Sequence, residues 1–504
     1  MKRLKPIFFC LVLILGVNSA VNAAPLSQPT GSILYVKPIA SGIDDCSSWN
    51  DACGLQDALD IANSCDEIWV AAGTYLPTMP ISSIFPKNSP TFNLETGVAI
   101  YGGFPAEGGE WRDRDPAAHL TTLSGELGLP GDDSDNSFHV VTGSGVDQSA
   151  VLDGFTISNG RAVGSVGGGG MYNRGGGSPT LNNLTFSDNV GRFGGGMYNE
   201  SGSPTLTNVS FIDNYGYYGG GMLNSGSSPT LTNVIFLRND TGNYGGGMMN
   251  NYYSSPKLTN VTFSSNHADN AGGGMASLNY SEPFLTNVTF TGNTINLKNY
   301  GAAIITDNSS VNLTNAIVWG NTPSINQIFD NDETAFTFAS YSIIEGGYPG
   351  ETNIASDPFL SPLANNGGYT QTHALGAGSP AIDAGNPSTC PPPANDQRGY
   401  PRPIDGNNDG IAVCDMGAYE FGFTLTADIE GSGTVAINPD KADYLAGETV
   451  TLTATAAPDW AFTGWSGDAV GTSNPLAITI SGHTEITANF TQIRFRYMLF
   501  PIYK

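Results

Sequence analysis

The sequence predicts an all-β protein whose main part is a right-handed parallel β-helix with about 25–27 residues per coil. The first observation is a glycine-rich block that recurs as GGGMYN, GGGMLN and GGGMMN along the chain. The second is a motif such as TLTNVSF, which recurs in step with the first. Two motifs sharing one period indicate one structural turn per repeat, and parallel crossovers are almost always right-handed. The position after the glycines is occupied by Met171, Met197, Met222, Met248, Met275 and Ile304.

The order of apolar residues within a repeat predicts three short strands per coil. Val209 and Phe211 alternate as in a strand, whereas Leu206 has the wrong parity to share their face. Asn208 lies between them, and asparagine tolerates the left-handed conformation that a sharp corner needs. Leu206 therefore ends one strand and Val209 begins the next, while Met197 lies on a third. The repeats show no helical periodicity, so a helical solenoid is disfavoured.

Stacking the coils at about 4.8 Å places equivalent residues directly above one another. Stacked asparagine amides can then hydrogen-bond along a column. We expect a structural ladder at the first corner, formed by Asn183, Asn208, Asn233, Asn260, Asn287 and Asn315. We expect a second column formed by Asn189, Asn214, Asn239, Asn266, Asn293 and Asn321. Leucine and phenylalanine columns at 181/206/231/258/285 and 186/211/236/263/290 fill the predicted core.

The N-terminus predicts an exported protein. Residues 1–23 combine basic residues, an apolar run and small residues before Ala23, as in a secretory signal peptide whose core is too short to span a membrane. No later stretch is long and apolar enough to do so. Acidic residues outnumber basic ones 45 to 19, a formal charge of −26, which disfavours nucleic acid and anionic membranes as partners. We therefore expect a secreted or cell-surface protein.

The remaining chain divides into five regions. Residues 24–75 are expected to form an N-terminal cap, with a short amphipathic helix near residues 55–62, and the first strand. The other predicted regions are the β-helix at 76–345 with regular repeats at 168–321, a C-terminal segment at 346–423, a small β module at 424–491 and a tail at 492–504.

Five cysteines follow the leader, and an exported chain favours disulfides. Local spacing predicts Cys46–Cys53 and Cys390–Cys414, which leaves Cys65 free; a Cys53–Cys65 pair stays open as an alternative. No CxxC pair indicates zinc or redox chemistry.

Several stretches resemble known families. The GGGM…SPTLTNVTF units resemble the β-helix repeats of bacterial surface proteins, including polymorphic outer-membrane proteins. The stretch SDPFLSPLANNGGYTQTHALGAGSPAIDAGNP…DQRGYPRPIDGNNDGIAVCDMGAYEF, residues 356–421, resembles choice-of-anchor Q proteins. Residues 424–491, with GSGTVAINPD and GETVTLTATA, look like a divergent internalin-type B repeat. These resemblances imply a secreted or cell-surface β-helix protein and carry over no settled activity.

The sequence DGNNDG predicts a metal site. Asp405, Asn407 and Asp409 alternate and Gly410 follows, as at the start of a calcium loop, with Asp415 as a further ligand. The acid that normally closes such a loop is missing, because Met416 stands in its place, and Asp415 or Glu420 is the expected substitute. A plain Asp/Asn/Gly turn held by the nearby disulfide is the alternative interpretation. Calcium is the one cofactor that the sequence suggests.

Two further groups are candidates for ligand binding and catalysis. The aromatic residues before the glycine blocks could form a platform for sugar rings or could simply stack on one another; they are Phe193, Tyr218, Tyr244 and Tyr300. Asp188 and Asp213 occupy equivalent places in adjacent coils, near the carboxylate spacing of a retaining glycosidase. Arg238 follows in the next coil, so ordinary Arg-paired corner residues are the alternative.

These observations predict an adhesin-like scaffold that binds glycans or other extracellular polymers, or a cell-envelope surface, without catalysis. A polysaccharide lyase or glycoside hydrolase on the same fold is the first alternative. A purely structural envelope protein is the second.

Overall fold

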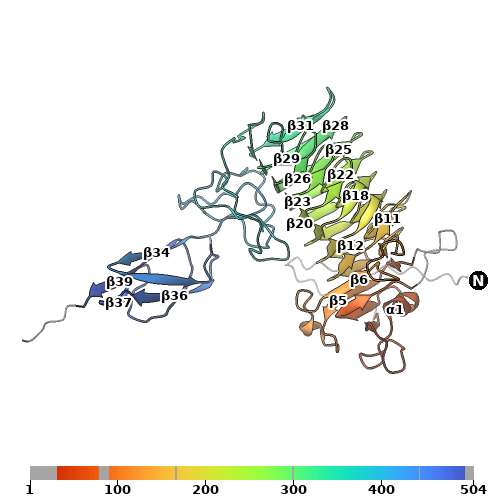
Figure 1. Ribbon diagram of the computed structural model, residues 1–504, viewed down its shortest axis with the longest axis horizontal. Helices are drawn as coiled ribbons and strands as arrows, with labels where there is room; N and C mark the ends of the chain where they lie inside the picture. Colours follow the sequence, from red (N-terminus) through yellow and green to blue (C-terminus); the bar gives the residue numbers. More distant parts are fainter. Residues whose placement is uncertain (1–30, 79–89, 165–166, 298–299, 442, 494–504) are drawn as a thin grey trace, which may run out of the picture.

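The computed structural model describes residues 31–78, 90–164, 167–297, 300–441 and 443–493. The predicted signal peptide and most of the predicted tail lie outside these residues. A stack of coils forms the body of the molecule, and an irregular segment packs beside it (Figure 1). A small module formed by the last strands lies beyond that segment. None of the described helices is long and apolar enough to cross a membrane.

The first coils contain the cap. The strand β1 (Ile33–Val36) pairs in parallel with β2 (Glu67–Ala71), and the helix α1 (Leu55–Ile61) lies between them in sequence. Leu55, Ala58 and Leu59 are buried on one helix face, as the amphipathic pattern predicts. Parallel pairing therefore begins at β1, within the region assigned to cap and first strand.

Three parallel sheets build the coils in the described residues. The largest, here called the lateral sheet, bends at the asparagine corner. After β1 and β2 it contains β3 (Gly73–Tyr75), β5 (Ala99–Phe104), β6 (Thr121–Ser124), β8 (Val151–Asp153), β9 (Thr156–Ser158), β12 (Thr180–Asn182), β13 (Thr185–Ser187), β16 (Thr205–Thr207), β17 (Ser210–Ile212), β20 (Thr230–Leu237), β23 (Lys257–Ser264), β26 (Phe284–Thr291), β29 (Ser310–Thr314), β30 (Ile317–Trp319), β32 (Phe336–Ser340) and β33 (Ile343–Ile344).

The second sheet, here called the methionine sheet, carries the GGGM block. It contains β4 (Phe92–Asn93), β7 (Val141–Thr142), β11 (Met171–Arg174), β15 (Met197–Glu200), β19 (Met222–Ser225), β22 (Met248–Asn251), β25 (Met275–Leu278), β28 (Ile304–Asp307) and β31 (Ile328–Asp330). The third, the short sheet, contains β10 (Arg161–Ala162), β14 (Val190–Phe193), β18 (Tyr215–Tyr218), β21 (Asp240–Thr241), β24 (His267–Ala268) and β27 (Thr294–Ile295). The sequence predicts three strands per coil, and the short sheet adds a fourth.

The predicted corner and core are both present. Asn208 has φ +58°, and its counterparts in the five other coils of this column have φ between +52° and +57°. Leu206 pairs with Leu231 and Phe211 with Phe236, so like residues stack along the axis. The rings of Phe211 and Phe236 lie 4.9 Å apart and nearly parallel. Every residue of these columns is buried, which gives the solenoid a continuous apolar core.

The three glycines of each block meet two requirements, a left-handed backbone conformation at the first and a close backbone approach at the other two. Gly194 has φ +63°, which favours glycine. A Cβ on Gly195 would lie 2.3 Å from the carbonyl oxygen of Tyr215, and one on Gly196 would lie 2.7 Å from that of Gly221. The backbone of the next coil thus approaches too closely for any side chain, and the methionine that follows enters the core.

Three asparagine ladders run along the solenoid. In the first, Asn208 donates from Nδ2 to Oδ1 of Asn183 at 3.0 Å. In the second, fully buried, Asn214 donates to Oδ1 of Asn239 at 2.9 Å. The third was not predicted, although it is the last letter of GGGMYN; its buried members are Asn173, Asn199, Asn224 and Asn250. Amides satisfied within these columns supply hydrogen-bond partners that the buried corners require.

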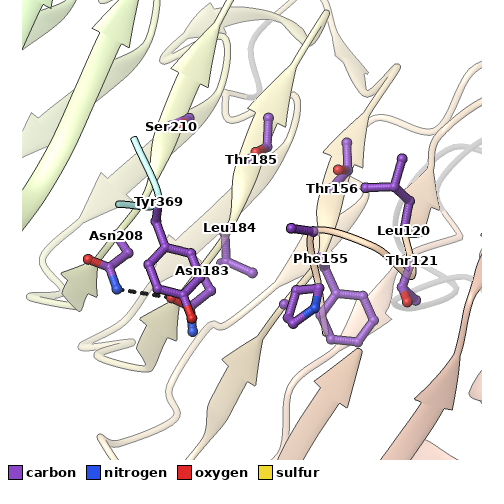
Figure 2. Close-up of a pocket in the computed structure, with 13 residues that line it drawn as sticks. Leu120, Thr121, Phe155, Thr156, Asn183, Leu184, Thr185, Asn208, Ser210 and Tyr369 are labelled. Atoms are coloured by element: carbon purple, nitrogen blue, oxygen red, sulfur yellow. Dashed lines mark hydrogen bonds between the residues drawn. The ribbon is translucent and has the colours of Figure 1, made fainter. Parts of the chain in front are cut away.

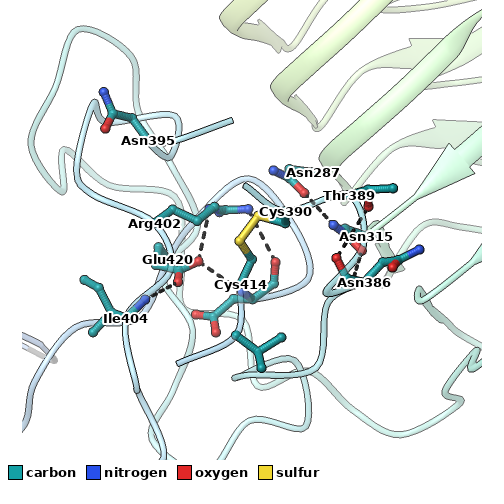
Figure 3. Close-up of a disulfide and its surroundings, with 12 residues drawn as sticks. Asn287, Asn315, Asn386, Thr389, Cys390, Asn395, Arg402, Ile404, Cys414 and Glu420 are labelled. Carbon is teal, nitrogen blue, oxygen red and sulfur yellow. Dashed lines mark hydrogen bonds and ion pairs between the residues drawn. A yellow bond between two sulfur atoms is a disulfide. The ribbon is translucent and has the colours of Figure 1, made fainter. Parts of the chain in front are cut away.

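Residues 346–423 pack on the outer face of the lateral sheet. Met416, Tyr419 and Phe421 cluster with Ile317 and Ile343 of the last coils. The disulfide Cys390–Cys414 joins two loops of this segment, and a buried Arg402–Glu420 ion pair (3.0 Å) lies beside it (Figure 3). The other disulfide, Cys46–Cys53, lies in the cap, and Cys65 is free. The segment therefore covers one end of the lateral sheet.

The C-terminal module packs two small sheets around its own core. Trp465, Ile486 and Phe490 lie in that core with Leu452 and Ala488. One sheet contains β34 (Leu425–Glu430), β39 (Thr484–Gln492) and β37 (Trp460–Gly467), and the other contains β35 (Gly433–Asn438), β36 (Thr449–Ala456) and β38 (Leu476–Thr479).

Candidate functional site

A hollow of about 180 Å³ lies on the lateral sheet between loop 105–120 and the segment 346–423. Its floor consists of residues at the asparagine corner and on the strand that follows it (Figure 2). Loop 105–120 borders one end, and Tyr369, from the segment 346–423, stands over the other. The lining residues are Pro116, Ala117, Leu120, Thr121, Gly154, Phe155, Thr156, Asn183, Leu184, Thr185, Asn208, Ser210 and Tyr369.

Loop 105–120 is fixed against the sheet by Arg114. The guanidinium donates to the carbonyl oxygen of Gly102 at 2.7 Å and pairs with the carboxylate of Asp153. Asp153 also accepts Nδ2 of Asn183 at 3.0 Å. This carboxylate therefore ends the first asparagine ladder and holds the loop in place, with little of either charged side chain exposed.

The first ladder is open at one end and covered at the other. Asn183 and Asn208 are half-buried and line the hollow. Asn260 is buried beneath the segment 346–423 and donates to the carbonyl oxygen of Asn395 at 2.8 Å. At the far end the Oδ1 of Asn315 accepts the backbone N–H of Asn386 at 2.7 Å (Figure 3). The ladder therefore faces solvent only in its first coils.

The hollow presents hydroxyls and amides next to apolar surface. Thr156, Thr185 and Ser210 contribute hydroxyls, and Tyr369 is 63% exposed. Tyrosine is the sole ionisable side chain among the thirteen lining residues. This arrangement can bind an uncharged hydroxylated ligand by stacking and hydrogen bonds, and it supplies no carboxylate, imidazole or ammonium group for acid–base catalysis.

Comparison with known proteins agrees with this architecture. Residues 140–322 match the family model described as right handed beta helix region. The solenoid is a right-handed β-helix. Residues 423–494 match the divergent InlB B-repeat domain, which confirms the predicted C-terminal module. No curated protein matches the chain. Among solved structures, the chain is similar to the "Crystal structure of pectate lyase Pel9A", with 17% identity, 78% of this chain and 97% of that chain covered, and a TM-score of 0.43. A likeness this weak carries no argument about activity.

The predicted aromatic column packs against the protein itself. Phe193 and Tyr218 stack with ring centroids 6.0 Å apart, and both are half-buried. With Tyr244 and Tyr300 they lie against a small apolar cluster that includes Leu223. The rings therefore offer less free surface than an open platform would.

Asp188 and Asp213 lie at a left-handed corner beside the short sheet. Their φ angles are +56° and +54°, and Arg238, the next residue of the column, has φ +51°. Arg238 binds both carboxylate oxygens of Asp213, at 2.8 and 2.6 Å, and this hydrogen-bonded pairing raises the pKa of Arg238. The group is exposed and does not line the hollow. Its geometry is that of an Arg-paired corner.

Asp415, predicted as a further ligand of the calcium loop, is bound to backbone groups of the segment 346–423. Asp415 is fully buried and accepts the backbone N–H groups of Asp383 and Phe421. Burial beside Glu420 raises its pKa well above the usual value. In the loop itself, Asp405 accepts the N–H groups of residues 409 and 410. The described residues contain no group of three or more His, Cys, Asp or Glu side chains placed to hold a metal ion.

Sequence reasoning missed Tyr369 and loop 105–120. Tyr369 lies in the run NNGGYTQTHAL, which has no repeat partner, and it reaches the hollow because the segment 346–423 folds back on the lateral sheet. The available signal was weak: an aromatic residue directly after two glycines, a pattern typical of an exposed turn.

Proposed function

We propose that this protein is an exported β-helix scaffold, of the choice-of-anchor Q type, that binds neutral glycans or similar extracellular polymers without catalysis. The lateral sheet supplies a rigid surface, and the hollow at its open end supplies the binding site. The divergent B-repeat module serves as a spacer or attachment module. Export rests on the predicted signal peptide alone.

The chemistry of the hollow is the observation that carries this proposal. Hydroxyls and amides lie in its floor beside apolar side chains, and an exposed tyrosine ring lies over Asn183 and Asn208 at one end. Sugars offer hydroxyls for such polar groups and an apolar ring face for the tyrosine. The floor offers no positive charge to an acidic polymer, and the whole chain, with a formal charge of −26, repels one. Neutral polymers are therefore favoured over acidic ones.

The test is binding of the exported chain to neutral and acidic polysaccharides, scored by affinity electrophoresis and calorimetry. We expect Tyr369→Ala to weaken the affinity for a neutral glycan about fivefold, because it removes one stacking contact worth about 1 kcal/mol. The matched control is Tyr253→Ala, which removes a comparably exposed ring (70%) outside the hollow. Equal losses in both variants would contradict the assignment of the hollow.

The alternatives predict different results. A lyase or hydrolase would release shorter products from a bound glycan, and Asp213→Asn would abolish that release. A purely structural envelope protein would self-associate and bind none of the glycans. Retained affinity with unchanged glycan length supports the scaffold.

Calcium remains a prediction for the loop that contains Asp405, Asn407 and Asp409. Calorimetric titration of the wild-type chain and of Asp405→Asn tests it, since a calcium loop would lose its affinity in the variant.

A further inference from the structure

A second hollow, of about 550 Å³, lies on the other side of loop 105–120. Its floor is aromatic and its rim is acidic. The lining residues are Tyr35, Trp49, Trp69, Glu107, Gly108, Gly109, Glu110, Arg112 and Asp113. We propose that this aromatic hollow binds an organic cation, namely an alkylammonium or guanidinium group.

The sheet itself builds the floor. Tyr35 pairs in register with Trp69, and Trp69 with Tyr101, so these outward side chains form one column on β1, β2 and β5. One face of Trp69 stacks on Phe104, with centroids 4.7 Å apart. Trp49 donates from Nε1 to the carbonyl oxygen of Gly109 at 2.8 Å, which holds the ring against the loop. The floor is therefore preorganised rather than a chance patch.

The rim residues give the aromatic hollow a negative net charge. Glu107, Glu110 and Asp113 carry three carboxylates and Arg112 one guanidinium, a formal net charge of −2. Arg112 pairs with Glu110 at 2.9 Å on the exposed rim, which leaves Glu107 without an ion pair among the described residues. A cation over aromatic faces gains from the ring quadrupole and from nearby carboxylates, whereas an anion gains from neither.

The same aromatic cluster already holds one cation. The guanidinium of Arg114 lies 5.5 Å from the centroid of Tyr101 and 5.3 Å from that of Trp111. Trp111 in turn lies 5.6 Å from Trp69, so the two ring systems are continuous. The chain therefore uses these rings as a cation-binding surface on one side of the loop, and the hollow offers equivalent rings to a ligand on the other.

Tryptophan fluorescence of the whole chain provides the test. We would titrate choline, N-acetyl-arginine amide, and the neutral choline isostere 3,3-dimethyl-1-butanol at constant ionic strength. Both cations are expected to saturate at concentrations at least about tenfold lower than the neutral isostere. A response to choline alone would identify a quaternary-ammonium site, and a response to both would extend the site to basic peptide side chains.

Variants locate the response. Glu107→Gln is expected to weaken choline binding severalfold while leaving the fold intact, because its side chain is exposed. Trp69→Leu should abolish binding, and circular dichroism would show whether the variant is folded. Tyr369→Ala, in the uncharged hollow, should leave choline binding unchanged. Equal affinity for the neutral isostere, insensitivity to Glu107→Gln, or no saturable response would each overturn the proposal.

Discussion

Replacing Asn214 by alanine tests whether the buried asparagine ladder stabilises the solenoid. Its Nδ2 donates to the carbonyl oxygen of Phe186 and to Oδ1 of Asn239, both at 2.9 Å. Its Oδ1 accepts both the side-chain Nδ2 (3.0 Å) and the backbone N–H (3.2 Å) of Asn189. The side chain therefore makes four hydrogen bonds in a site that is 1% exposed.

The expected loss of stability follows from these contacts. Alanine leaves buried polar groups of Asn189 and Phe186 without partners, at about 1–3 kcal/mol for each group that water cannot reach. Three such groups lose a partner, and the lower part of this range gives an expected loss of about 3–5 kcal/mol in the free energy of unfolding.

The matched control is Asn208→Gly in the exposed part of the first ladder. Glycine keeps the left-handed conformation of this corner, and water can replace the two half-exposed amide hydrogen bonds. We expect a loss of no more than about 1 kcal/mol. Urea unfolding followed by circular dichroism measures both variants. A difference between them of less than about 1 kcal/mol would refute the argument from buried amides.

Three further predictions concern other parts of the chain. Gly196→Ala should lower the free energy of unfolding by about 1–3 kcal/mol, because its Cβ would meet a backbone oxygen at 2.7 Å. Gly482→Ala, with open space around it, should leave stability unchanged. Equal melting temperatures in the two variants would contradict the close approach of neighbouring coils at Gly196. Burial raises the pKa of Glu420 from 4.5 to about 7. The stability that the protonated carboxyl contributes is therefore complete below about pH 4.5 and is lost as the pH rises through 7. Relative to Glu420→Gln, the wild-type melting temperature should fall between these pH values, and parallel curves of melting temperature against pH would contradict the raised pKa. The double variant Cys390→Ser/Cys414→Ser removes a disulfide of sequence separation 24 and should lower the free energy of unfolding of the segment 346–423 by about 3 kcal/mol. A protease should then cut this segment faster in the variant than in the wild type. Unchanged cleavage would show that packing alone holds the segment.

The local geometry of the coils could be predicted because the same pattern of residues recurs in every repeat. Leu206 is out of phase with the strand that follows it, which located the corner at Asn208, and the positive φ of Asn208 confirms that reasoning. The Met197 position in the core follows equally from the repeat. The fourth strand was missed because a residue such as Gly191 in β14 gives no alternating pattern.

The candidate site could not be predicted in the same way. Tyr369 lines the same hollow as Asn183 across a large sequence separation, and no periodic pattern connects the two. Asp415 was assigned to a metal loop by spacing alone, whereas its burial depends on how the segment 346–423 packs. Loop 105–120 has its position because Arg114 reaches Asp153, a contact that is visible only in three dimensions.

The coverage of the lateral sheet by residues 346–423 also limits the size of any ligand. The strands β6, β9, β13 and β17 lie side by side under the hollow that Tyr369 lines, with Thr122, Thr156, Thr185 and Ser210 paired in that order. Three strand spacings correspond to about 14 Å of accessible sheet. Tyr369 stands at one end of this run and Leu120 at the other (Figure 2). A polymer lying along the solenoid axis can therefore be held only over a short stretch, so we expect short oligosaccharides to bind about as tightly as the long chains from which they come.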